Sequence, residues 1–136
     1  MQLQPYLFFD GRSDEAINFY KRAVGAEVVM LMRFKDTPKT APQMHTPEMA
    51  ERVMHARLRI GDATVFVSDG RCGGKPKFDG FSLTITAPTS AEAERLFAAL
   101  GEGGQVMMPM GPTFFSPRFG MLADRFGVPW QVIAEK

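Results

Sequence analysis

The spacing of apolar residues predicts a first helix over about 14–24. Ser13 precedes it as the expected N-cap, and Gly25 follows it as the expected C-terminal stop. The apolar positions recur every three or four residues and give the helix one apolar face: Ala16, Ile17, Tyr20, Ala23 and Val24. The helix is therefore expected to pack this face against a sheet.

A second helix is predicted over about 90–100, with the same punctuation. Thr89 and Glu92 have the spacing of a capping box, and Gly101 ends the apolar stripe. Aligned with the first helix, the second repeats its pattern of serine, glutamate, alanine and aromatic residue. Two short helices can agree by chance, so the flanking strands decide whether the chain is duplicated.

Extended runs surround each helix in the same order. Around the first helix they cover 3–9, 27–34, 53–60 and 64–68, with Gly61 and Asp62 predicting a tight hairpin turn between the last two. Around the second helix they cover 81–86, 105–110, 119–123 and 128–134. Each half is thus predicted to be one strand, one helix and three strands.

This repeat predicts an α+β fold made of two β-α-β-β-β modules, about 1–70 and about 79–134. We expect residues 1–136 to form a single domain, in which the two modules make a curved, partly open barrel-like sheet with the helices outside. Three connections stand out: 36–52 with three prolines, 69–79 rich in glycine, and 109–118, which holds Phe114 and Phe115 between prolines. Each is either a lid over a site or an ordinary surface loop.

Composition narrows the function classes. A formal net charge of +1 gives no basis for expecting nucleic acid or an acidic membrane as partner. No apolar run approaches the roughly 20 residues that cross a bilayer, and the N-terminal residues lack the pattern of a signal peptide. The lone cysteine, Cys72, has no internal disulfide partner. We therefore expect a cytoplasmic protein.

Several segments together resemble one superfamily: QPYLFFDGRSDEAINFYKRAVGAEV, HARLRIGDATVFVSDG, GFSLTI, TFFSPRFG and DRFGVPWQVI. They span nearly the whole chain and resemble the vicinal oxygen chelate superfamily of glyoxalases, extradiol dioxygenases and bleomycin-resistance proteins. The closer likeness is to its PhnB-like branch, some members of which carry a methyltransferase label that no residue here supports. The resemblance implies the glyoxalase/bleomycin-resistance fold and a homodimer, but no particular reaction.

In the metal-dependent members of this superfamily, the first and last strand of each half lend one ligand each. The positions that match them in this chain are Pro5 (with Gln4 and Tyr6 beside it), Val67 (with Ser68 and Asp69 behind it), Ser82 and Gln131. These side chains offer no strong donor set. We therefore expect no metal of the glyoxalase type and no cofactor. A shifted site using His55 and Asp69 is the alternative, while His45 occupies no ligand position.

Other residues are candidates for binding a small molecule. His55 alternates with apolar neighbours beside Arg57 and Arg59, which predicts a titratable base next to two cations that hold an anion; structural pairing is the alternative. Asp69 is either a functional carboxylate or a turn residue, and Cys72 is a weaker candidate for a nucleophile. The predicted ligand-binding set is Tyr6, Phe8, Arg33, His55, Arg57, Asp69, Ser82, Phe115 and Gln131.

Three functions remain open at this point. The favoured one is a protein that binds a small organic ligand in the pocket without metal. The alternative is a metal-dependent lyase, isomerase or dioxygenase with a degenerate or shifted metal site, so the chain is not assigned as an enzyme or a non-enzyme. The third is a regulatory dimer without small-molecule chemistry.

Overall fold

The structure is a computed structural model that describes residues 1–38, 46–70 and 75–136. His45, Cys72 and part of the predicted lid over 36–52 lie outside the described residues. The described elements, in chain order, are β1 (Tyr6–Phe8), α1 (Ser13–Val24), β2 (Glu27–Arg33), η1 (Phe34–Asp36), η2 (Pro47–Met49), β3 (Val53–Ile60), β4 (Ala63–Ser68), β5 (Leu83–Ala87), α2 (Ser90–Gly101), β6 (Gln105–Gly111), β7 (Phe119–Ala123) and β8 (Pro129–Ala134). Neither α-helix in this part of the chain is long and apolar enough to cross a membrane.

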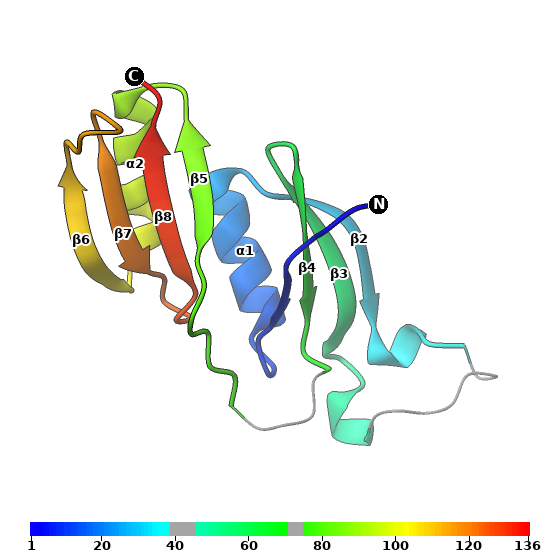
Figure 1. Cartoon of the computed structure of the whole chain (residues 1–136). Helices are drawn as coiled ribbons and strands as arrows, with labels where there is room; N and C mark the ends of the chain where they lie inside the picture. Colours follow the sequence, from blue (N-terminus) through cyan, green and yellow to red (C-terminus); the bar gives the residue numbers. More distant parts are fainter. Residues whose placement is uncertain (39–45, 71–74) are drawn as a thin grey trace. The chain divides into compact units, whose positions relative to one another are not determined.

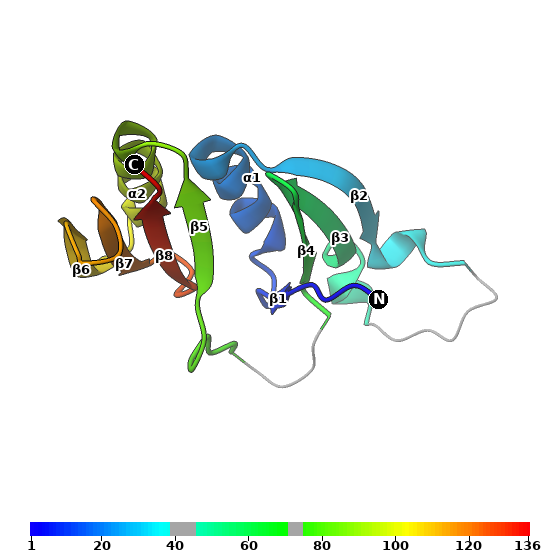
Figure 2. The same ribbon diagram turned by 45° about the horizontal axis from the view of Figure 1, so that its top comes forward.

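The chain divides into two compact units, Met1–Pro76 and Lys77–Lys136, which we call unit 1 and unit 2. Each unit contains one four-stranded mixed sheet, with strand order β1-β4-β3-β2 in unit 1 and β5-β8-β7-β6 in unit 2. In both, the first and last strands of the unit pair in parallel and the other pairs are antiparallel. Figures 1 and 2 show this order of strands within each unit. The predicted α+β fold and the repeated order of elements are confirmed.

One face of the unit 1 sheet is packed against α1. Alternate residues of the strands point to this face and are almost fully buried: Leu7, Ala56, Leu58, Val65 and Val67. The apolar side of α1 meets them with Ala16, Ile17, Tyr20 and Ala23, each at most 4% exposed. Burying a large apolar side chain of this kind contributes about 1.5–3 kcal/mol. The predicted apolar face of the helix is therefore its core-facing side.

Unit 2 repeats this arrangement around α2. Leu122 of β7 and the alternating residues of β8 lie in its core, facing the helix: Trp130, Val132 and Ala134. Gly120 of β7 lies on the same side, because a Cβ atom there would stand 2.6 Å from the ring of Phe97 on α2. Glycine at this position lets the helix approach the sheet closely.

The helix ends show where the sequence prediction was right and where it was wrong. Gly25 adopts the left-handed conformation, with φ of 69°, and ends α1 as predicted. Thr89 caps α2 by accepting a hydrogen bond from the amide of Glu92 at 3.2 Å. Ser13, however, is the first residue of α1 rather than its N-cap, and its hydroxyl donates to Asp69 at 2.6 Å. A carboxylate distant in sequence therefore takes the place of the predicted local cap.

The prediction that the two modules form one curved, barrel-like sheet concerns their placement relative to one another, and it stays a prediction, as does the single domain.

Candidate functional site

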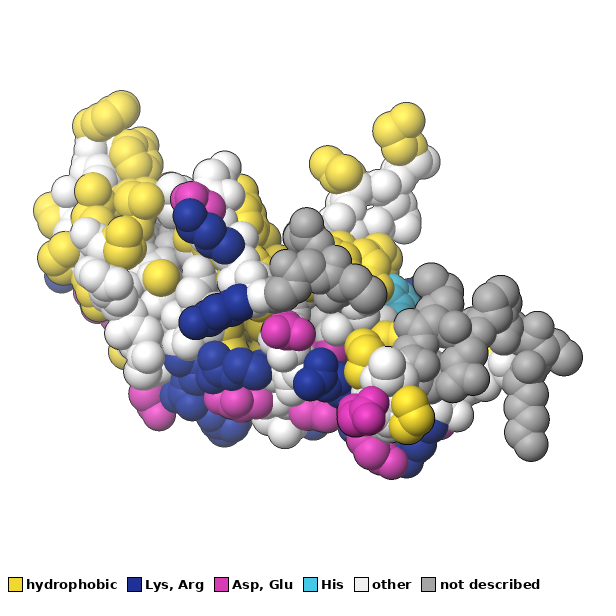
Figure 3. All heavy atoms as spheres, turned by 90° about the horizontal axis from the view of Figure 1, so that it is seen from below, with side chains coloured by type: hydrophobic (Ala, Val, Ile, Leu, Met, Phe, Trp, Pro, Cys, Tyr) yellow, Lys and Arg dark blue, Asp and Glu magenta, His cyan; other side chains and the backbone are white. Residues whose placement is uncertain are grey.

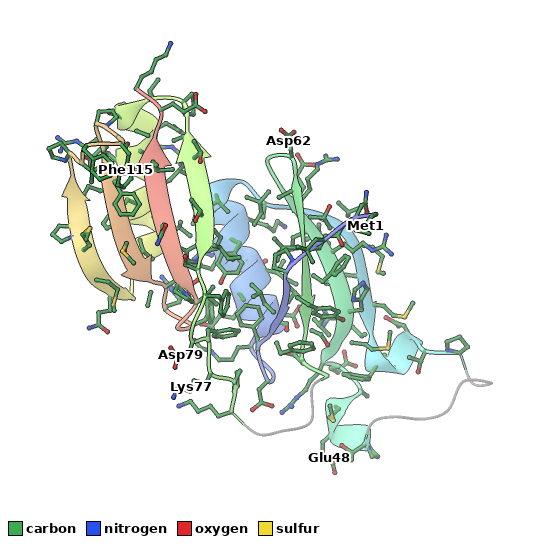
Figure 4. All side chains as sticks on the ribbon, viewed as in Figure 1. Met1, Glu48, Asp62, Lys77, Asp79 and Phe115 are labelled. Carbon is green, nitrogen blue, oxygen red and sulfur yellow. The ribbon has the colours of Figure 1, made fainter. Side chains whose placement is uncertain are left out.

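The face of the unit 1 sheet opposite α1 carries an aromatic cluster with a histidine and an arginine. We call this surface the aromatic face of unit 1, formed by Tyr6, Phe8, His55, Arg57 and Phe66. The strand register explains the grouping, because Tyr6 and Arg57 are both Cα partners of Phe66. Side chains at alternate positions of a strand share one face, so His55 and Phe8 join them. Figure 4 shows the side chains that project from these strands.

The rings on this face contact one another. Tyr6 is stacked on Phe8, with ring centroids 4.7 Å apart and planes inclined by 3°. The ring of Phe66 lies 5.5 Å from Tyr6 and 5.2 Å from His55, centroid to centroid. Tyr6 nevertheless remains 40% exposed. The face is therefore an aromatic surface that a planar apolar group can cover.

A hydrogen bond of 2.7 Å joins the hydroxyl of Tyr6 to Nδ1 of His55. Burial lowers the pKa of His55 below its ordinary value, and the charge of Arg57 lowers it further. Burial raises the pKa of Tyr6, against a smaller opposing effect of the Ser68 hydroxyl. At neutral pH the pair is therefore a neutral phenol bonded to a neutral imidazole.

Arg57 differs from Arg59 on the same strand in having no carboxylate partner in the described part of the chain. Its guanidinium carbon lies 5.9 Å from the ring centroid of Phe66, and no carboxylate in the described part of the chain lies within 4 Å of it. Arg59, two residues along the same strand, is paired with Glu27 of β2. In Figure 3 the basic and acidic side chains are intermixed rather than separated by sign. Arg57 thus leaves an uncompensated positive charge on the aromatic face.

The structure does not bring two of the predicted residues of unit 1 to this face. Arg33 forms a two-pronged ion pair with Asp14 of α1, at 2.9 and 3.0 Å, and also donates to the carbonyl of Glu51 at 2.7 Å. The Asp14 carboxylate raises the pKa of Arg33. Arg33 is therefore engaged with the helix and the chain before β3 rather than with the Tyr6–His55 pair.

Asp69 is a buried structural residue. Its Oδ1 accepts hydrogen bonds from the amides of Gly11 and Ser13, at 2.7 and 3.1 Å, and from the Ser13 hydroxyl. Its Oδ2 accepts from the amide of Val53 at 3.1 Å, and the residue is only 2% exposed. A carboxylate at the start of a helix also interacts favourably with the helix dipole. Both oxygens are committed to holding the start of α1 against the start of β3.

The remaining predicted residues belong to unit 2. Gln131 of β8 lies on the face opposite α2, where its Cα partners are Thr84 and Met121. Ser82 lies just before β5, so the strand residue that points to this face is Thr84. Phe115 packs edge-on against Phe119, with centroids 5.1 Å apart, and is labelled in Figure 4. Whether these residues share one pocket with the aromatic face of unit 1 stays a prediction.

The strand positions that match the metal ligands of the superfamily do not carry side chains suited to a metal ion. Val67 is fully buried on the helix side of β4, so the residues of that strand that face away from α1 are Phe66 and Ser68. The other strands offer Tyr6, Thr84 and Gln131, which are neutral oxygen donors and include no histidine or carboxylate. No group of three or more histidine, cysteine, aspartate or glutamate side chains suited to a metal ion occurs among the described residues. Divalent transition metals prefer imidazole, thiolate or carboxylate ligands.

Phe66 is a site residue that the sequence analysis did not select. It stands at the centre of the aromatic face, in contact with Tyr6, His55 and Arg57. The signal was present in the alternation of 64–68, where Val65 and Val67 are apolar core positions and Phe66 lies between them. Because Val67 was taken as the counterpart of a metal ligand, the alternate residues of β4 were assigned to the wrong faces of the sheet.

This fold is that of the glyoxalase and bleomycin-resistance proteins. The fosfomycin resistance protein FosX from Mesorhizobium loti shares it, with a TM-score of 0.64 at 13% identity over 98% of this chain and 90% of that one. More specifically, the model of the family described as 3-demethylubiquinone-9 3-methyltransferase matches residues 1–133. The chain belongs to this family, the PhnB-like one.

Three relatives are similar over nearly their whole length. Protein YjdN of Escherichia coli is 34% identical over 97% of this chain and 94% of its own. The crystal structure of protein PA1353 from Pseudomonas aeruginosa has a TM-score of 0.84 at 40% identity, covering 99% of this chain and 98% of that one. The PhnB protein from Bacillus cereus has a TM-score of 0.79 at 27% identity, covering 98% of this chain and 99% of that one.

Proposed function

We propose that this protein binds a small organic ligand on the aromatic face of unit 1 without a metal ion of the glyoxalase type. The observation that carries the proposal is Arg57, a cation without a carboxylate partner in the described residues, standing beside Phe66 and the Tyr6–His55 pair. Apolar surfaces with a few placed polar groups are typical of small-molecule sites. The face combines an aromatic surface with one positive charge and one polar pair.

The alternative is a metal-dependent lyase, isomerase or dioxygenase with a shifted metal site. Such a site needs His55, Asp69 and Gln131 as ligands, and both oxygens of Asp69 are already used by amides and a hydroxyl. The methyltransferase in the family's description has no support in the fold of either unit. Each sheet is mixed and four-stranded rather than a doubly wound parallel sheet with a glycine-rich first turn.

The first test is the metal content of the purified full chain, followed by calorimetric titration with nickel, zinc, manganese and iron(II). The proposal predicts no stoichiometric metal and no tight binding. Tight binding that is lost in His55→Ala and kept in Thr84→Ala would contradict the metal-free proposal and make glyoxalase and dioxygenase assays the next experiment.

The second test asks whether the aromatic face binds a ligand at all. Fluorescence titration of chelator-treated protein with 2-naphthoate and 2-naphthamide probes this directly. Phe66→Ala removes the central ring and is expected to weaken binding of both probes at least fivefold. The matched control, Phe114→Ala, removes a fully exposed ring of unit 2 and leaves binding unchanged. Absence of binding by both probes would contradict the proposal.

The proposal includes a homodimer working in the cytoplasm. The family resemblance supports the dimer, and a lone cysteine without an internal disulfide partner supports a reducing compartment. Light scattering coupled to size-exclusion chromatography measures the molar mass, which is expected to be about twice the 15.1 kDa of the chain. A mass of one chain would remove the dimer from the proposal.

A further inference from the structure

The hydrogen bond between Tyr6 and His55 determines what the imidazole offers to a ligand. A phenol is a stronger acid than a neutral imidazole N–H, and an imidazole nitrogen is a better acceptor than a phenol oxygen. This chemistry favours the Tyr6 hydroxyl as the donor and Nδ1 of His55 as the acceptor in the 2.7 Å bond, in which the roles depend on the tautomer of the ring. A neutral imidazole that accepts at Nδ1 carries its proton on Nε2. The favoured form of His55 is thus the Nε2–H tautomer.

The Nε2–H group has no hydrogen-bond partner among the described residues, and neither does it face a carboxylate there. Arg57 projects from the same face two residues further along β3, where Cα atoms stand about 6.6 Å apart. Its long side chain can bring the guanidinium to the same anion that the imidazole binds. The face therefore presents two kinds of donor, one charged and one neutral, and neither has an acceptor partner among the described residues.

We infer that the ligand of the aromatic face is a planar aromatic carboxylate, held by the guanidinium of Arg57 and the Nε2–H of His55. The inference rests on the proposed function and names its ligand class. The carboxylate compensates the unpaired cation and accepts from both donors, and hydrogen bonds between charged partners are the stronger ones. The ring of the ligand covers the Tyr6, Phe8 and Phe66 rings, which favour offset or edge contacts with another ring.

The charges around the site favour this ligand class over a neutral or cationic one. The nearest other arginine on the strand, Arg59, is neutralised by Glu27. The strands that flank β3 on this face contribute Met30 and Met32, the Cα partners of Arg57 and His55, and the rings of β1 and β4. A cationic ligand would meet Arg57 with no carboxylate nearby, and a neutral amide would leave its charge uncompensated.

The test compares 2-naphthoate with 2-naphthamide, which share one ring system and differ in charge, by calorimetry on the chelator-treated full chain. The acid is expected to bind at least tenfold more tightly than the amide. Arg57→Gln is expected to abolish that difference, while the control Arg59→Gln, on the same strand and face, preserves it to within about twofold. Circular dichroism and thermal unfolding establish that both variants are folded.

The outcomes separate the inference from the proposed function. Equal affinity for the acid and the amide would overturn the carboxylate assignment and leave ligand binding intact. Binding of neither probe would remove the proposed function, and the inference with it. Retention of the tenfold preference in Arg57→Gln would also overturn the assignment.

The tautomer has an independent readout. The ¹⁵N chemical shifts of the His55 ring, identified by their loss in His55→Gln, are expected to show a protonated Nε2 and a bare Nδ1 in the free protein. Tyr6→Phe removes the phenol donor and is expected to shift the populations toward the Nδ1–H tautomer. A ring protonated at Nδ1 in the unmodified protein would contradict the role given to His55.

Discussion

The two units share one backbone arrangement and differ in the side chains they present on the face opposite the helix. In unit 1 that face carries three aromatic rings, a histidine and an arginine that has no carboxylate partner among the described residues. In unit 2 the corresponding strands carry neutral side chains: Thr84, Thr86, Phe119, Met121, Gln131 and Ile133. Strand order, parallel pair and buried alternation are the same in both. The two units thus share one scaffold, while on these strands the titratable and charged side chains of the face opposite the helix lie in unit 1.

Each unit has a buried carboxylate, and the two carboxylates differ in how far away in the sequence their hydrogen-bond partners lie. Asp69 connects segments more than fifty residues apart in sequence, from the start of α1 to the end of β4. Asp124 acts over a short range, accepting from the amides of Phe126 and Val128 and from the indole of Trp130. One fixes a long-range contact, and the other fixes a turn.

The largest effect on stability is expected when the long-range hydrogen bonds of Asp69 are removed. Asp69→Ala leaves three amides and one hydroxyl without their acceptor in a buried position. We expect a loss of about 4 kcal/mol in the free energy of unfolding, measured by urea denaturation. The exposed Asp62→Ala is the control and should change stability by less than about 0.5 kcal/mol. A loss for Asp69→Ala as small as that of the control would refute its structural role.

The next effect tests whether the two cores are equivalent. Leu58 on β3 and Leu122 on β7 face the helices of their units and are 0% and 1% exposed. Each change to alanine is expected to cost about 3 kcal/mol, because it removes buried methyl groups and leaves a cavity. Urea denaturation of both variants gives the comparison. A cost near zero in one unit alone would break the equivalence of the two scaffolds.

A smaller effect is expected on the pKa of His55, where the charge of Arg57 can be compared with that of Arg59. The charge of Arg57 contributes to the lowered pKa of His55, second to burial. Arg57→Gln is therefore expected to raise the pKa of His55, while burial continues to hold it below the ordinary value. Arg59→Gln should move it less, because Glu27 already compensates Arg59. Histidine titration by NMR measures both, and equal shifts in the two variants would contradict the assignment of Arg57.

The smallest effect is on stability as a function of pH. The folded protein binds the His55 proton less readily than the unfolded chain does, so stability falls as the pH drops through the unfolded value of about 6.5. Within the described ranges, the charged groups on this face are Arg57 and the Arg59–Glu27 pair. Because His55 is only partly buried, solvent screening keeps the effect small. Unfolding of the wild type between pH 7.5 and 5 should show a steeper decline than His55→Gln, and identical slopes would count against it.

Local patterns were sufficient for most of the fold. Both helices, the β3 and β7 strands and the Gly61 turn follow from alternation, capping and glycine positions that are visible within a few residues. The strand predicted over 3–9 is shorter, since only Tyr6–Phe8 pairs with β4. Pairing depends on a partner 60 residues away in the sequence, and no local pattern shows where the pairing ends.

The grouping of side chains on the aromatic face was predictable in part for the same reason. Strand alternation placed His55 and Arg57 on one face, and Tyr6 and Phe8 were selected as aromatic residues; that they bind a ligand stays a prediction. The partners of Arg33 and Asp69 were not visible in local patterns, because Asp14 and the start of α1 lie elsewhere in the sequence. Phe66 was missed because the parity of β4 is fixed by its register with β3 rather than by its own composition.

Ligand binding on the aromatic face of unit 1 is the proposal on which the other binding predictions depend. It can be tested by recording amide and side-chain chemical shifts with two-dimensional NMR during titration with 2-naphthoate. We expect saturable shifts at Tyr6, His55, Arg57 and Phe66, with Thr84, Met121 and Gln131 unchanged. Shifts that are confined to the unit 2 residues would contradict it.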